Sequence, residues 1–256
     1  MGGLAGKIAI VIGASRGIGA ASGAALADAG ATVCLAAPAP ETCEPIVESI
    51  RADGGQAEAF DCDVSDSAQV ENLVDSIHRK HGQIDILINC AGVMGPVAML
   101  EDCDPDAWLR CIKINLTGAF NACRAVLPHL RRRNTGVIVN MSTGAAFNAL
   151  QGWSAYSSSK AGLAMLSQII AAEVQGTEIR MYSFQPGMVN TKLGQQSMKV
   201  DINKVTNLDP NSFSSPAEPA QAITWLCSED AADLAGQEVV ITDPDFRRRA
   251  GLQSIN

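Results

Sequence analysis

The chain has 256 residues, of which 47% are hydrophobic and 18% are charged, and its formal net charge is −8. This composition excludes a mainly disordered chain, and the excess of acid argues against nucleic acids and anionic membrane surfaces as partners. No apolar run approaches the roughly 20 residues that a membrane span needs, and the first residues lack the basic start of a signal peptide, so a cytoplasmic protein is expected.

Cysteine and histidine usage narrows the possible sites further. The eight cysteines contain no Cys-x-x-Cys pair, and the three histidines share no spacing pattern. A free thiol in apolar surroundings acts as a small hydrophobic side chain. We therefore expect reduced cysteines and no metal site, with Cys90 as the alternative in which a thiol is a nucleophile.

Short apolar runs alternate with helical patterns along the chain, which is typical of parallel β-α-β units. Strands are predicted at residues 7–12, 32–36, 57–61, 84–89, 136–141, 180–184 and 237–241. Helices are predicted at residues 17–28, 41–52, 66–80, 104–127, 155–175 and 216–227. No linker or repeat divides the chain, so residues 1–256 are expected to form a single doubly wound α/β domain of about seven parallel strands with helices on both faces.

One long irregular stretch interrupts this alternation at residues 187–215. Loops longer than about 12–15 residues in a compact domain are usually lids or binding loops. This stretch is therefore predicted to be a substrate-binding lid.

A glycine-rich turn joins the first predicted strand to the first predicted helix, with the sequence GASRGIG at residues 13–19. Glycines there let the backbone approach a pyrophosphate, which the N-terminus of the helix then stabilises. A P-loop is excluded because no Gly-Lys-Ser/Thr follows. The sequence predicts a nucleotide site, with an ordinary tight turn as the alternative.

A second group of polar residues lies near the predicted helix 155–175. Tyr156 and Lys160 are four positions apart and so share one face of that helix. An ammonium, together with the positive ring of an oxidised nicotinamide, would lower the pKa of the phenol and make it an acid–base catalyst. Ser142 and Thr143, which leave the fifth predicted strand, are candidates for the hydroxyl that polarises a substrate oxygen.

The spacing Gly-x-x-x-Gly-x-Gly, together with Asn89-Cys90-Ala91-Gly92 and Tyr156-x-x-x-Lys160, resembles the short-chain dehydrogenase/reductase family over nearly the whole chain. The resemblance implies a Rossmann-type domain that binds NAD(P)(H). The cofactor-binding residues it implies are Gly13, Ser15, Arg16, Gly17, Ile18, Gly19, Ala37, Asp63, Val64, Asn89, Ala91, Gly92, Tyr156, Lys160, Pro186, Gly187, Val189 and Thr191.

The choice of cofactor depends on the end of the second strand. The resemblance implies an acidic residue there in members that use NAD, but this chain has Ala37, flanked by Ala36 and Pro38. Arg16 resembles the basic residue that NADP-dependent members direct at the 2′-phosphate. NADP(H) is favoured, because a neutral pocket with one arginine tolerates the phosphate, and NAD(H) stays possible.

The resemblance also assigns catalytic roles. Tyr156 exchanges the proton, Lys160 tunes the phenol and holds ribose hydroxyls, and Asn115 orders a water that leads to the lysine. Counted back from Tyr156, the family's serine falls at Thr143, so Thr143 is favoured as the hydroxyl donor. One extra residue in the intervening loop would select Ser142 instead.

We expect a carbonyl reductase or alcohol dehydrogenase that acts on a small to medium, apolar ketone or secondary alcohol. Side chains beside the site segments are candidates for the substrate pocket: Met94, Phe147, Trp153, Met188 and Leu193. The alternatives are a 3-oxoacyl thioester reductase and a regulatory protein that binds the cofactor without catalysis. The resemblance further implies a homodimer or homotetramer, formed through the helices that contain Asn115 and Tyr156.

Overall fold

The computed structural model describes residues 3–196, 202–203, 205, 208–209 and 213–254. Its strands form one parallel seven-stranded sheet in the order β3-β2-β1-β4-β5-β6-β7, which confirms the predicted fold class. The strands are β1 (Ile8–Ile12), β2 (Thr32–Ala37), β3 (Gln56–Asp61), β4 (Ile86–Asn89), β5 (Thr135–Met141), β6 (Glu178–Gln185) and β7 (Glu238–Val240). The chain proceeds outward from β1 to β3 and then returns to place β4 beside β1. A crevice opens at the carboxyl ends of the strands where the order reverses in this way.

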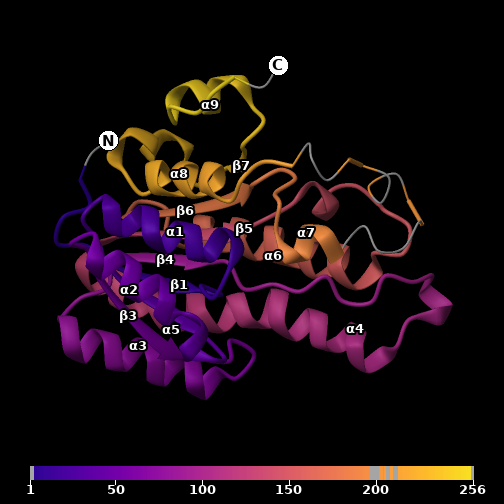
Figure 1. Ribbon diagram of the computed structural model, residues 1–256, viewed down its shortest axis with the longest axis horizontal. Coiled ribbons are helices and arrows are strands. Elements are labelled where there is room, and N and C mark those ends of the chain that lie inside the picture. Colours follow the sequence, from indigo (N-terminus) through magenta and orange to yellow (C-terminus); the bar gives the residue numbers. More distant parts are fainter. Residues whose placement is uncertain (1–2, 197–201, 204, 206–207, 210–212, 255–256) are drawn as a thin grey trace.

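Helices cover both faces of the sheet, with α8 on one side and α3 and α5 on the other in Figure 1. They are α1 (Gly17–Asp28), α2 (Glu44–Ala52), α3 (Ser67–His81), α4 (Pro105–Ile112), α5 (Gly118–Arg133), α6 (Ser154–Glu173), α7 (Lys192–Gln196), α8 (Ala217–Leu226) and α9 (Pro244–Arg249). Within the described residues, no helix has both the length and the apolar character needed to cross a bilayer.

The sheet separates two apolar layers. In β1, Ala9 and Val11 point into the layer under α1, α2 and α8, whereas Ile8, Ile10 and Ile12 point into the layer under α3 and α5. Both faces of the strand are therefore buried. This explains why the sequence has a continuous apolar run there rather than an alternating one.

The structure adds detail to the predicted elements in three places, beyond shifts of a few residues at several element ends. The helix predicted at 104–127 is divided into α4 and α5 by a π-helical turn, Lys113–Thr117, and α5 continues through Pro128 to Arg133. The last turn of α5 is held from outside, because Arg131 donates to the carbonyl of Glu173 and Arg133 pairs with Asp85. These contacts offset the hydrogen bond that a proline removes from a helix.

The second and third differences lie toward the C-terminus. The stretch 187–215 contains α7, and its base is closed by a bridge between Val189 and Ser214. Much of the predicted lid lies outside the described residues. The third difference is α9, which no sequence pattern predicted; Asp243 caps it by accepting a hydrogen bond from the Phe246 amide.

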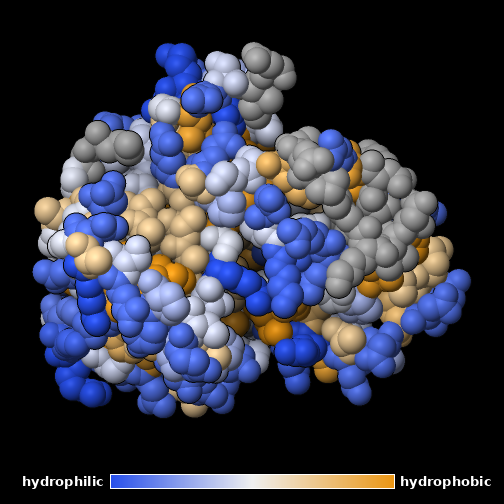
Figure 2. Space-filling model, viewed as in Figure 1, coloured by the Kyte–Doolittle hydropathy of each residue, from blue (hydrophilic) through white to orange (hydrophobic). Residues whose placement is uncertain are grey.

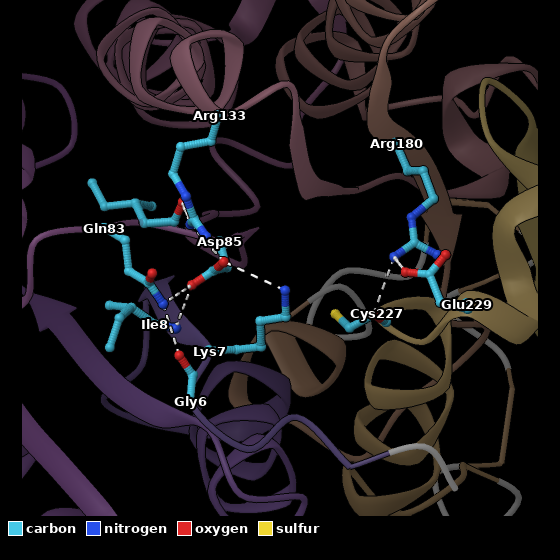
Figure 3. Close-up of polar contacts among 10 residues, drawn as sticks. Gly6, Lys7, Ile8, Gln83, Asp85, Arg133, Arg180, Cys227 and Glu229 are labelled. Carbon is cyan, nitrogen blue, oxygen red and sulfur yellow. Dashed lines mark hydrogen bonds and ion pairs between the residues drawn. The ribbon is translucent and has the colours of Figure 1, made fainter.

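At the amino ends of β1 and β4, a buried carboxylate ties the sheet together (Figure 3). Asp85 is 2% exposed and accepts hydrogen bonds from the amide of Ile8 at 2.9 Å and from Gln83 at 3.0 Å. Its other oxygen lies 2.7 Å from the Arg133 guanidinium and 3.5 Å from the Lys7 ammonium. Asp85 thus joins two neighbouring strands and the end of α5.

Candidate active site

A cavity of about 460 Å³ opens at the carboxyl ends of the strands. Its wall is formed by the turns that follow β1 to β6 and by parts of α4, α6 and α7. Figure 2 shows this side of the molecule, with hydrophilic and apolar side chains next to each other near the centre of the face. A cavity of this size and mixed lining is typical of a small-molecule site. It is called the cleft below.

One end of the cleft is shaped by the absence of side chains. Gly13 has a φ of +82°, and a Cβ there would lie 2.5 Å from the amide nitrogen of Ala91. A Cβ at Gly19 would lie 2.2 Å from the Gly13 carbonyl oxygen. These approaches are too close for any other residue, so both positions need glycine.

The first turn of α1 faces this end of the cleft. Its N-cap residue, Arg16, makes no capping hydrogen bond with its side chain, so the first amides of the helix have no side-chain acceptor. Gly17, Ile18 and Gly19 all line the cleft. Free amides at a helix N-terminus attract phosphate oxygens, so this end fits the pyrophosphate of a dinucleotide.

The flanks of the glycine loop fit the rest of an adenosine group. Asp63, Val64 and Ser65 line the cleft, and the Asp63 carboxylate accepts hydrogen bonds from the amide and the hydroxyl of Ser65. At the end of β2, Ala37 is buried and Pro38 lines the cleft in its place. The exposed Arg16 also lines it.

At the other end, Tyr156 lies on the first turn of α6 and is 7% exposed. Its ring packs edge-to-face against Trp153, with 5.8 Å between the ring centres. The Thr143 side chain lies close enough to the Tyr156 phenol to lower its pKa, and the Thr143 hydroxyl accepts a hydrogen bond from the Ala145 amide at 3.3 Å. Ser142 also lines the cleft, but its buried hydroxyl has no partner among the described residues. The structure thus places both candidate hydroxyls in the cleft, and the choice between Thr143 and Ser142 as hydroxyl donor stays a prediction.

Burial dominates the electrostatics of Tyr156 and Lys160. It raises the pKa of Tyr156 to about 12, an effect that the Thr143 side chain opposes in part. It lowers the pKa of Lys160 to about 8. The Lys160 ammonium lies 5.9 Å from the centre of the Tyr156 ring and donates to the Met141 carbonyl at 2.7 Å. The expectation that this ammonium and a bound oxidised nicotinamide together lower the Tyr156 pKa stays a prediction.

Asn115 lies behind the wall of the cleft, in the π-helical turn. Its side-chain oxygen accepts from the Val93 amide at 2.8 Å, and its nitrogen donates to the Val93 carbonyl at 2.9 Å and to Ser159 at 3.0 Å. A π-helical turn often marks a functional site. Here it orients one amide that holds both the backbone after β4 and the start of α6.

Four residues predicted for the site are absent from the described lining: Ala37, Asn89, Asn115 and Phe147. Asn89 instead donates to Asn140 at 2.8 Å beneath the cleft, which links β4 to β5. Phe147 is 54% exposed and does not line the cleft, so the structure does not bring it together with the other predicted pocket residues. The other predicted pocket residues, Met94, Trp153, Met188 and Leu193, do line the cleft.

The sequence missed several residues in the wall, among them Arg110, Lys113, Ile114 and Lys192. The first three have the spacing i, i+3, i+4, which places them on one side of α4 and the turn after it. That spacing was visible beside Asn115 and would have identified them. Cys90 also lines the cleft, but burial raises its pKa to about 12, which keeps the thiol protonated and argues against a nucleophile.

Several known proteins are similar to this chain in sequence or in structure. The D-threitol dehydrogenase of Mycolicibacterium smegmatis is 36% identical over 240 residues, which cover 93% of this chain and 92% of that protein. The 3-oxoacyl-[acyl-carrier-protein] reductase of Thermotoga maritima is 29% identical over 239 residues, covering 93% and 97%. A crystal structure of NAD+-bound xylitol dehydrogenase superimposes with a TM-score of 0.86 at 28% identity, covering 93% of this chain and 98% of that one.

A family model gives the same assignment from the sequence. The model described as short chain dehydrogenase matches residues 7–201, which include the glycine loop, Tyr156 and Lys160. The chain is therefore a member of the short-chain dehydrogenase/reductase family of NAD(P)(H)-binding oxidoreductases.

Proposed function

We propose that this protein is an NADP(H)-dependent carbonyl reductase or alcohol dehydrogenase in which Tyr156 exchanges the proton. The observation that supports this best is the buried Tyr156 phenol in the cleft wall, beside Thr143 and one helical turn from Lys160. A phenol, a hydroxyl and an ammonium around one cavity are the groups that exchange of a hydride and a proton at a carbonyl requires.

When bound, the nicotinamide cofactor supplies the hydride in reduction and accepts it in oxidation. Thr143 donates a hydrogen bond to the carbonyl oxygen of the substrate and so polarises it. As the carbonyl carbon gains the hydride, its oxygen takes the Tyr156 proton and becomes the alcohol. The raised pKa keeps this proton on the phenol at neutral pH but also makes the phenol a weak acid, so the transfer depends on positive charge that favours the phenolate, which Lys160 and a bound oxidised nicotinamide would supply. Lys160 stabilises the phenolate until it is reprotonated.

Apolar walls around the phenol support a substrate with a hydrocarbon portion. Met94, Trp153 and Tyr156 form one buried cluster, against which Leu193 packs. Trp153 is the N-cap residue of α6 and Leu193 lies on α7, so both helices contribute to the wall at the substrate end of the cleft. These walls favour a small to medium ketone or secondary alcohol.

The preference for NADP(H) is supported by the end of β2. The residues there, Ala37 and Pro38, are neutral and so do not repel a 2′-phosphate. Arg16 also lines the cleft. The NAD+-bound structural relative keeps NAD(H) as the alternative. Arg16→Gln should raise the KM for NADPH about tenfold and leave the KM for NADH unchanged.

The test is oxidation of NADPH and of NADH, followed by absorbance with a panel of ketones and aldehydes. The proposal expects consumption of NADPH with formation of the alcohol in equal amounts. Cofactor binding without consumption across the panel would contradict it and would favour the regulatory alternative.

A 3-oxoacyl thioester reductase is the second candidate, supported by the similarity to the Thermotoga maritima enzyme. The discriminating measurement is kcat/KM for an acyl-carrier-bound 3-oxoacyl thioester against the corresponding free ketone. A clear preference for the carrier-bound form would select this candidate.

We also propose a homo-oligomer in the cytoplasm. Four large apolar side chains on α4, α5 and α6 are exposed: Leu109, Phe120, Met165 and Ile169. Exposed apolar side chains of this kind mark contact surfaces. Sedimentation of the wild type and of Phe120→Lys tests the assembly, since a lysine in the contact surface should dissociate the oligomer into monomers.

The proposed cytoplasmic location is supported by the eight free cysteines, which fit a reducing compartment.

A further inference from the structure

Three consecutive serines lie between Tyr156 and Lys160 on α6, and the structure surrounds their hydroxyls differently. Ser157 is half-buried, and its hydroxyl has no partner among the described residues. Ser158 is exposed. Ser159 is fully buried, and its hydroxyl makes two hydrogen bonds. The third serine therefore differs from the other two in being tied to the rest of the protein.

The two hydrogen bonds of Ser159 have defined directions. Its oxygen accepts from the side-chain nitrogen of Asn115 at 3.0 Å, and its O–H donates to the carbonyl of Tyr156 at 2.7 Å. A helical serine often donates to a carbonyl about one turn earlier, and that bond alone would be local. The bond from Asn115 makes the same hydroxyl a link between the π-helical turn and the first turn of α6.

The link continues from Asn115 to the wall of the cleft. Asn115 accepts from the Val93 amide and donates to the Val93 carbonyl. Val93 lines the cleft, and the next residue, Met94, belongs to the same buried cluster as Tyr156. Hydrogen bonds thus connect the cleft wall after β4, through Asn115 and Ser159, to the backbone of Tyr156.

The groups around Ser159 are closed to solvent. Asn115 is 1% exposed, and Cys111, whose sulfur lies 4.0 Å from the Ser159 oxygen, is fully buried. If the hydroxyl is removed, the Tyr156 carbonyl loses a donor and the Asn115 nitrogen loses an acceptor in a place that solvent does not reach. The loss of this link is therefore not compensated by water.

The first turn of α6 has a second point of attachment. The hydroxyl of Ser154 accepts from the indole N–H of Trp108 on α4 at 3.2 Å. Tyr156 lies between Ser154 and Ser159 along the helix, so side-chain hydrogen bonds hold the turn that carries the phenol at both of its ends. A group that transfers a proton must be placed within a fraction of an ångström, and supporting hydrogen bonds provide such placement.

We propose that Ser159 is a positioning residue for Tyr156, because its hydroxyl ties the backbone of Tyr156 to Asn115 and so fixes the phenol relative to the cleft. The inference rests on the proposed function, in which Tyr156 exchanges the proton. Ser159 acts through the Tyr156 backbone and does not line the cleft. Since a displaced phenol impairs proton transfer more than cofactor binding, kcat should depend on Ser159 and the affinity for NADPH should not.

The kinetic test compares Ser159→Ala with Ser157→Ala in the full chain. Ser157→Ala is the matched control, because it removes a hydroxyl without a described partner from the same turn of the helix. With the best ketone of the panel, Ser159→Ala should lower kcat about tenfold and leave the Kd of NADPH within about twofold of the wild type. Ser157→Ala should keep both values, and equal kcat values for the two variants would overturn the inference.

A spectroscopic test observes the Tyr156 ring itself. The chain has two tyrosines, Tyr156 and Tyr182, so protein labelled with fluorotyrosine gives two fluorine NMR signals, which Tyr156→Phe assigns. Tyr182 is fully buried and donates to the Ala231 carbonyl, which makes it an internal reference. Ser159→Ala should shift the Tyr156 signal by more than its linewidth and leave the Tyr182 signal in place. A Tyr156 signal that stays at the wild-type position would overturn the inference.

Unfolding in urea separates positioning from a merely structural role. If Ser159→Ala is less stable than the wild type but keeps the wild-type kcat and Tyr156 signal, Ser159 only stabilises the fold and the inference is overturned. Ser159→Cys is a second variant that preserves the size of the side chain with a weaker donor, so its kcat should lie between those of Ser159→Ala and the wild type. If Ser159→Ala does not fold, wild-type kcat and a wild-type Tyr156 signal in Ser159→Cys overturn the inference.

The fluorine signals also separate this inference from the proposed function, because they need neither substrate nor turnover. If Tyr156→Phe keeps the wild-type turnover, the proposed function fails, while a shifted Tyr156 signal in Ser159→Ala still shows that Ser159 positions the ring. If Tyr156→Phe loses turnover and Ser159→Ala leaves the signal unchanged, the proposed function stands and the inference about Ser159 is overturned.

Discussion

Charged side chains at the two ends of the parallel strands differ in whether they have partners. At the amino ends, Asp85 is surrounded by Lys7, Arg133 and Gln83, and Arg180 on β6 donates to Glu229 and to carbonyls at the end of α8 (Figure 3). At the carboxyl ends, Arg16, Arg110, Lys113 and Lys192 line the cleft, and their side chains have no hydrogen bond or ion pair with another described residue. Lys160, which also lines the cleft, donates to the Met141 carbonyl.

This difference indicates that the amino ends of the strands contribute to stability and the carboxyl ends to function. A buried charge with all its hydrogen bonds made stabilises one arrangement of the strands, and removing a partner is costly. A polar group without a partner contributes nothing comparable to the fold, but it is available to a ligand. Changes at the amino ends should therefore affect unfolding, and changes at the carboxyl ends should affect turnover.

The largest expected effect is at the carboxyl ends. Tyr156→Phe removes the proton donor without changing the ring that packs on Trp153. We expect kcat to fall about a thousandfold, the range for loss of a general acid, and the midpoint of thermal unfolding to stay within a few degrees. Steady-state kinetics with the best ketone of the panel measures the first effect. Turnover within tenfold of the wild type would contradict the assignment.

The opposite result is expected at the amino ends. Asp85→Ala leaves the Ile8 amide and the Arg133 guanidinium without their acceptor. We expect a loss of about 3 kcal/mol in the free energy of unfolding, measured with urea. Glu71→Ala, which breaks the exposed pair with Arg124, is the control and should cost less than about 1 kcal/mol. Equal costs for the two variants would remove the contrast between the ends of the sheet.

Two neighbouring hydroxyls in the cleft can be compared directly. Thr143→Ala removes the hydroxyl that we propose polarises the substrate oxygen, so kcat should fall about a hundredfold. Thr143→Ser should restore most of it. Ser142→Ala should have an effect below about tenfold, because that hydroxyl contacts no described residue. A larger loss in Ser142→Ala than in Thr143→Ala would reverse the assignment of the donor.

The smallest expected effect concerns the cost of burying Lys160. Its pKa falls from 10.5 to about 8 on folding, so below pH 8 the folded protein holds a buried charge at full cost. As the pH rises from 8 toward 10.5, only the unfolded chain retains the proton, and this cost disappears. Between pH 7 and 9.5, the unfolding free energy of the wild type should therefore rise by about 2 kcal/mol relative to that of Lys160→Met. Urea titrations at the two pH values, without cofactor, measure it. Parallel curves would mean that Lys160 is not buried as a charge.

The sequence predicted the fold because its local signals and its burial agree. A continuous apolar run such as β1 is stable only when both faces are covered, and the turn at residues 13–19 requires glycine for steric reasons that the sequence already contains. Pro128 misled the prediction, since the contacts of Arg131 and Arg133 that extend α5 come from residues far away in the chain.

The sequence predicted the part of the site that is formed by residues just after the ends of strands. Tyr156, Lys160 and Thr143 meet because the turn after β5 and the start of α6 lie over the same edge of the sheet. The raised pKa of Tyr156 and the cations at Arg110 and Lys113 were not predicted. Desolvation and the lack of partners are properties of the packed structure, not of the spacing of residues.

The Kd of NADPH for the Tyr156→Phe protein, measured by fluorescence titration beside the wild type, tests whether cofactor binding and proton transfer depend on different residues. We predict a value within about twofold of the wild type, because the glycine loop and the N-terminus of α1 hold the phosphates and the phenol exchanges a proton. An affinity that falls as far as the turnover falls would contradict it, because Tyr156 would then be a binding residue and not the acid.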